Sequence, residues 1–195
     1  HEMKSMEQLT AQAAFGKLDR EDPGRWHSLV DHMADVGAVF EALCACRSVR
    51  RALEAAAGRP LLCADISRLC ALAFLHDYGK ANAGFQAKRW LPGERPRHRL
   101  VAGHGAEAIA LLEAATASDE AWATLSCLPI EAMATNWGDE AVVALLRASV
   151  AHHGRPIACA PDWSATRVHW RSQDGYEPAL QLKLIGGALQ RFVPS

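Results

Sequence analysis

The sequence of 195 residues lacks the features that mark several common classes of protein. It has no run of about 18 or more apolar residues, which a membrane-spanning helix needs, and no signal-peptide pattern. Its six cysteines form no C-x-x-C pair, which argues against a zinc knuckle or a thioredoxin-type motif. Its formal net charge of −1 argues against a strongly basic nucleic-acid binder. We therefore expect a cytoplasmic protein with reduced thiols and no membrane partner.

Aromatic residues and β-branched runs are also scarce, whereas hydrophobic residues make up 50% of the chain, with Ala and Leu dominant. Because no alternating strand pattern is present, this balance predicts an all-α fold. The length fits one domain with a sizeable core. His1 and Glu2 precede Met3 and are treated as an addition, so His1 takes no part in the functional argument.

Apolar residues spaced three and four apart predict a series of amphipathic helices. Gly58 and Gly79 are expected to end two of them, and Asp139 to cap a third. The segment 19–24 is expected to form a turn. The segments 81–99 and 157–176 are expected to be loop-rich or irregular. The expected helices cover residues 6–15, 28–45, 49–57, 65–77, 105–115, 119–128, 129–135, 139–153 and 178–192.

The adjacent residues His76 and Asp77 end the most apolar of these helices. An imidazole beside a carboxylate offers one neutral nitrogen ligand and one anionic oxygen ligand, and the carboxylate can bridge two cations. Such a pair at the end of a buried helix suits hydrolysis by divalent metals better than it suits packing.

Further histidines lie on three other predicted helices: His32 on 28–45, His104 at the start of 105–115, and His152 and His153 at the end of 139–153. A bundle can bring side chains from four helices to one site. Taken singly, each histidine is more simply a hydrogen-bonded core or surface residue, and a histidine pair at a helix C-terminus also suits the helix dipole. Only the whole set favours metal binding. The other internal histidines are assigned to the surface, the surroundings of the site or loops: His27, His98 and His169.

Five imidazoles and one carboxylate are too many ligands for one tetrahedral ion. They suit two ions that share a bridging carboxylate, which would be Asp77. Two ions about 3.5–4 Å apart can activate a water and stabilise the leaving oxygen of a phosphodiester. Nitrogen-rich ligation favours Mn, Fe, Co, Ni or Zn over Mg, which prefers oxygen ligands.

Basic residues are frequent between Lys88 and Arg99, and this loop either guides a nucleic-acid strand or is simply solvated. Trp90, Trp163 and Trp170 are candidates for base stacking. We expect at least two of the three to pack in the protein instead.

The order of these motifs resembles a known family. It consists of H-x-x-D-V at 32–36, H-D-x-G-K at 76–80 followed by G-F-Q at 84–86, a helix-opening His104, and H-H-G at 152–154. This order resembles the HD-superfamily phosphohydrolases. More narrowly, it resembles the HD nuclease domain of the CRISPR-associated helicase-nuclease of type I interference systems, over roughly residues 32–154.

The resemblance implies an all-α HD bundle whose two-metal centre cuts single-stranded DNA in antiviral defence. It also implies a superfamily-2 helicase, fused or separate, that feeds the strand after a guide-RNA surveillance complex opens the target. His32, His76 and Asp77 would hold the first metal. Asp77, His104, His152 and His153 would hold the second. Asp77 would bridge the ions, and Lys80 would lie beside the scissile phosphate.

One departure from the family pattern concerns the first metal. The family supplies a further aspartate from a late Ala-Asp-Trp phrase, which this chain does not contain. Asp162 precedes a tryptophan but lies in a loop soon after His153. We therefore expect residues 1–195 to be a single HD domain cut from a longer protein, with a weak first metal site.

Two alternative functions stay open. An HD phosphohydrolase acting on nucleotides or cyclic dinucleotides would use similar ligands. A non-catalytic domain could instead dock on a helicase or surveillance complex.

Overall fold

The computed structural model describes residues 13–19, 21–22, 24–90, 93, 95–135, 137–154, 157 and 162–193. It is mostly helical, which confirms the predicted all-α class apart from one two-stranded sheet. Among the helices in this part of the chain, none is long and apolar enough to cross a membrane.

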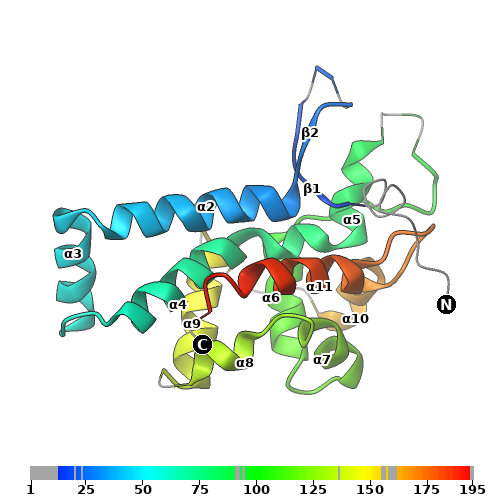
Figure 1. The fold of residues 1–195 in the computed structure, drawn as a ribbon. Helices are drawn as coiled ribbons and strands as arrows, with labels where there is room; N and C mark the ends of the chain where they lie inside the picture. Colours follow the sequence, from blue (N-terminus) through cyan, green and yellow to red (C-terminus); the bar gives the residue numbers. More distant parts are fainter. Residues whose placement is uncertain are drawn as a thin grey trace.

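Two long helices, α2 (Leu29–Cys44) and α4 (Cys63–Phe74), pack along each other, and α3 (Arg47–Ala57) joins them at one end of the molecule (Figure 1). The Ser28 hydroxyl caps α2 by accepting the Asp31 backbone N–H. At the end of α3, Gly58 adopts the left-handed conformation with φ of 66°. The predicted helices 28–45 and 49–57 are confirmed to within two residues at each end.

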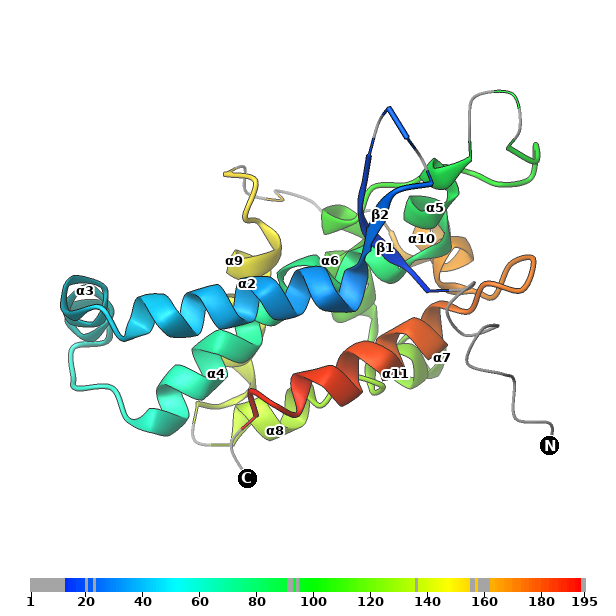
Figure 2. The same ribbon diagram turned by 45° about the horizontal axis from the view of Figure 1, so that its top comes forward.

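A short 3₁₀ segment, η1 (Leu75–Ala81), follows α4 directly and lies at the centre of the fold (Figure 2). It contacts helices α2 and α4, strand β1 (Phe15–Leu18), and helices α5 (Ala83–Gln86), α6 (Gly105–Ala114), α9 (Asp139–Val150) and α11 (Pro178–Leu189). The core around it contains fully buried side chains such as Met33, Phe74, Leu111 and Ile185. Two shorter helices, α7 (Asp119–Leu125) and α8 (Ile130–Ala134), lie between α6 and α9 in the chain.

The predicted helix 6–15 is wrong at its end, and its first part lies outside the described residues. Strand β1 (Phe15–Leu18) pairs antiparallel with β2 (Trp26–Ser28), and the predicted turn lies between them. These strands are too short to give a readable alternation. Hydrogen bonds from elsewhere in the fold hold β1, because the Gln86 side chain bonds both backbone groups of Phe15.

The predicted helix 65–77 is also corrected, since α4 ends at Phe74 and the next seven residues are 3₁₀. Gly79 does not act as a left-handed cap. It is required because a Cβ there would collide with the carbonyl oxygen of His104. At α9, Gly138 with φ of 82° precedes the helix, so Asp139 is its first residue and not its cap. The segments expected to be loop-rich contain α5 (Ala83–Gln86), η2 (Ala87–Arg89), α10 (Trp163–Thr166) and η3 (Arg167–Trp170).

Candidate metal centre

The 3₁₀ geometry of η1 aims Asp77 and Lys80 at each other. With three residues per turn, side chains at positions i and i+3 eclipse. The Lys80 Nζ accordingly lies 2.6 Å from Asp77 Oδ2 and also donates to the Gly16 carbonyl at 3.0 Å. Between them, the fully buried Tyr78 donates its hydroxyl to the Ala108 carbonyl at 2.7 Å. These bonds fix η1 against β1 and α6.

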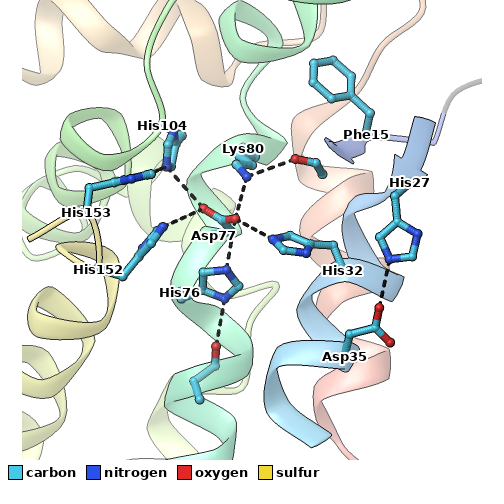
Figure 3. A network of polar contacts seen from close by, with 12 residues as sticks. Phe15, His27, His32, Asp35, His76, Asp77, Lys80, His104, His152 and His153 are labelled. Atoms are coloured by element: carbon cyan, nitrogen blue, oxygen red, sulfur yellow. Dashed lines mark hydrogen bonds and ion pairs between the residues drawn. The ribbon is translucent and has the colours of Figure 1, made fainter. Parts of the chain in front are cut away.

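The Asp77 carboxylate lies at the centre of the site, with its two oxygens facing different histidines (Figure 3). Its Oδ2 lies 3.1 Å from the Nε2 atoms of both His32 and His76. Its Oδ1 lies 3.3 Å from His104 Nε2 and 3.7 Å from His152 Nε2. One buried carboxylate therefore touches imidazoles from α2, η1, the start of α6 and the turn after α9.

The candidate ligands form two groups on either side of this carboxylate. His32, His76 and Asp77 form one group, and His104, His152 and His153 form the other. Within each group the ligand atoms lie within 4.8 Å of one another. The first group is buried, whereas His152 and His153 are exposed. The second group therefore forms the side of the centre that solvent reaches.

Hydrogen bonds to backbone carbonyls determine which nitrogen of two rings is free. His76 Nδ1 lies 2.9 Å from the Ala73 carbonyl, and His152 Nδ1 lies 3.2 Å from the Ser149 carbonyl. A carbonyl can only accept, so each Nδ1 carries the proton. In the neutral rings both Nε2 lone pairs point at Asp77. This arrangement of second-nitrogen bonds is typical of metal-ligating histidines.

The protonation states fit a cation between these groups. Burial lowers the pKa of His32 and of His152, which favours neutral rings. Burial alone would raise the pKa of Asp77, but the close contacts with His104, His76 and the Lys80 ammonium outweigh that effect and hold the pKa far below its usual range. Asp77 Oδ1 is buried without a hydrogen-bond partner among the described residues. An anionic oxygen facing nitrogen lone pairs is a donor set that suits a divalent transition metal.

Two buried side-chain amides, those of Gln86 in the G-F-Q phrase and of Asn82 just before it, support the segments that carry the site. Gln86 is buried; its Nε2 donates to the carbonyls of Phe15 and Lys80, and its Oε1 accepts the Phe15 N–H. Asn82 caps α5 and donates to the carbonyls of Gly79 and Gly103, next to His104. These two amides tie β1, η1 and the loop before α6 together.

The structure brings all six predicted metal ligands together, and Lys80 contacts the central carboxylate. Sequence reasoning missed Gly16, whose carbonyl accepts from Lys80 and whose close approach leaves no room for a Cβ beside His32. His27, which was assigned to the surface, the surroundings of the site or a loop, bonds Asp35 at 3.1 Å, and its ring centroid lies 6.2 Å from that of His32, so it belongs to the surroundings of the site.

Other candidates lie away from the centre. Arg99, which was placed in the basic loop, is buried and bonds Asp174. Trp170 is buried and donates its indole N–H to the Glu107 carbonyl. It therefore packs inside the protein, as at least two of the three tryptophans were expected to do. Asp162 caps α10 through Ser164 and belongs to neither ligand group.

Comparison with known proteins agrees with this geometry. The family model described as "Cas3, HD domain" matches residues 15–192, nearly the whole chain. Comparison with curated proteins and with solved structures gave no significant match. The described part of this range contains the helices and the histidine–aspartate centre expected from the resemblance. The chain belongs to the Cas3 HD-domain family of CRISPR-associated HD nucleases.

Proposed function

We propose that this domain is a metal-dependent nuclease that cuts single-stranded DNA in type I CRISPR interference. The observation that carries the proposal is the position of Asp77. Each of its oxygens faces a different group of histidines, at 3.1 Å on one side and 3.3–3.7 Å on the other. A carboxylate shared in this way suits two adjacent cations.

In this proposal His32, His76 and Asp77 would hold one ion. Asp77, His104, His152 and His153 would hold a second ion. When bound, the two ions supply Lewis-acid activation of the phosphodiester and of the attacking water. The nitrogen-rich donor set favours Mn, Fe, Co, Ni or Zn over Mg.

The protein's own contribution is orientation and access. Lys80 holds Asp77 through a 2.6 Å contact, and backbone carbonyls hold the rings of His76 and His152. The exposed fraction of the side chain is 2% for Asp77 but 31% for His152. The substrate therefore approaches from the side of the second group, while the first group stays shielded from water.

We propose that residues 1–195 are a single nuclease domain that works in the cytoplasm with a superfamily-2 helicase, fused or separate. The helicase would deliver the single strand after a guide-RNA surveillance complex has opened the target. A phosphodiester in a flexible single strand can enter a partly buried centre more readily than one in a stiff duplex.

The test uses circular single-stranded DNA with added Mn²⁺ or Ni²⁺. Wild type is expected to cut the circle, and Asp77→Ala and His152→Ala are expected to lose cutting. His98→Ala is the matched control, because this exposed histidine pairs with Asp174 away from the centre. Cutting by Asp77→Ala would refute the proposal. Turnover of nucleotides or cyclic dinucleotides without cutting would favour a small-molecule phosphohydrolase. Absence of metal binding and of cutting in the helicase-associated protein would favour a docking domain.

A further inference from the structure

A row of aromatic rings leads outward from the candidate metal centre. The Phe85 ring lies edge-on to His104, with centroids 5.3 Å apart, and its centroid is also 5.3 Å from that of Phe15. Two lysines lie over Phe85, with Lys80 Nζ at 5.6 Å and Lys88 Nζ at 4.2 Å from its centroid. Lys80 is engaged by Asp77, whereas Lys88 is exposed. Lys88 is therefore a positive charge near the centre that Asp77 does not engage.

The row continues onto the β-hairpin. The Arg89 guanidinium lies 5.9 Å from the Phe15 ring centroid and 5.6 Å from that of Trp26. Trp26 lies on β2, a strand of three residues, and has an exposed fraction of 38%. Arg89 lies over the indole on a hairpin that projects from the helices beside α5 (Figures 1 and 2). An exposed indole that packs against a cation is a suitable stacking surface for a base.

Lys88 and Arg89 lack the acidic ion-pair partners that Lys80 and other cations of the protein have. Arg59 pairs with Asp65, Arg99 with Asp174, and Arg171 with Glu120. Lys88 and Arg89 form no ion pair with any residue in the described part of the chain. Because the whole chain carries a net charge of −1, this local excess of positive charge is not a general property of the surface. A row of phosphates would neutralise it.

We propose that Lys88, Arg89 and Trp26 form a track that binds the single-stranded DNA flanking the cut site. Lys88 binds a phosphate next to the metal centre, and Trp26 stacks an unpaired base beyond it. The proposal rests on the nuclease function and adds the path by which the strand leaves the centre, along η2 and the hairpin. A duplex does not fit this chemistry, because its bases are already stacked on each other.

Binding to a labelled oligo-dT is the test, measured by fluorescence anisotropy on the full chain with EDTA present so that no cutting occurs. Trp26→Ala and Lys88→Ala are expected to raise the Kd roughly 5- to 100-fold, the range that loss of one stacked base or one good contact produces. Lys88→Ala is also expected to reduce the slope of log Kd against log salt by roughly 0.7, the value for one phosphate on a single strand. Trp26→Phe keeps a stacking ring and is expected to restore most of the affinity.

Matched controls are Trp122→Ala and Lys183→Ala. Trp122 is exposed to a similar extent (44%) on α7, and Lys183 is exposed on α11. Unchanged binding by Trp26→Ala and Lys88→Ala, or equal losses in the controls, would overturn the track. Cutting of circular DNA is measured separately. If wild type binds through the track but cuts nothing with metal, the nuclease proposal fails and the binding site stands.

Discussion

Replacing Gln86 with Leu tests whether the G-F-Q phrase supports the metal centre. Gln86 makes three hydrogen bonds to backbone groups, two to Phe15 and one to Lys80, at 2.8–3.0 Å. Leu has a similar volume, so the change removes the bonds without a large cavity. Phe15 is buried with an exposed fraction of 3%, so water cannot replace the lost partner.

The expected loss follows from these three bonds. Each buried backbone group left without a partner costs about 1–3 kcal/mol, so after partial relaxation the total is about 3–5 kcal/mol. For a chain of this size 1 kcal/mol corresponds to about 2–4 °C in melting temperature, which predicts a decrease of about 6–20 °C. Gln86→Glu is expected to be at least as damaging, because a carboxylate has no N–H to donate to the two carbonyls.

The assay is thermal unfolding followed by circular dichroism, with metal chelated. Gln190→Leu is the matched control, because Gln190 is an exposed glutamine just after α11, and its melting temperature is expected to stay close to that of wild type. Gln86→Leu is also expected to lose nuclease activity, since Gln86 holds β1, and β1 carries the Gly16 carbonyl that accepts from Lys80. A melting temperature for Gln86→Leu within about 2 °C of wild type would refute the reasoning, because even one orphaned buried group costs more.

Three further predictions concern glycine, cysteine and metal. Gly79→Ala is expected to lower the melting temperature and the metal affinity, because the new Cβ would collide with the His104 carbonyl. Gly187→Ala is the contrasting variant: Gly187 lies in α11 with open space around it, so the change is expected to stabilise the protein by about 0.5–1 kcal/mol. Alkylation at pH 8, followed by peptide mass spectrometry, is expected to label the exposed Cys46 quickly. Cys70 is expected to stay unmodified until the protein unfolds, because burial shields the thiol and raises the pKa of Cys70 to about 11. Equal labelling of the two cysteines would contradict this. Calorimetric titration with Mn²⁺ is expected to give fewer than two tightly bound ions per chain, because the first group offers only His32, His76 and Asp77 as ligands. Two ions at full occupancy would mean that another residue completes the first site.

Much of the fold could be predicted because helical periodicity is a local property. The spacing of apolar residues located α2, α3, α6 and α11 to within a few residues. The hairpin could not be predicted, since strands of three and four residues carry too little pattern and β1 is held by the distant Gln86. The change from α to 3₁₀ geometry after Phe74 is also a tertiary effect, because it accompanies the bond from Tyr78 to Ala108 and the close contact of Gly79 with His104.

The candidate site divides in the same way. Residue types and their order in the chain were enough to nominate the six ligands and to identify the family, because metal chemistry restricts which side chains can serve. The sequence alone also determined the helical class, through its composition and periodicity. Only the tertiary structure decided which oxygen of Asp77 faces which histidines, that Lys80 is held by Asp77 and Gly16, and that the Arg89 guanidinium lies over the exposed Trp26 ring. The physical reason is that distances between residues far apart in the chain depend on how the helices pack.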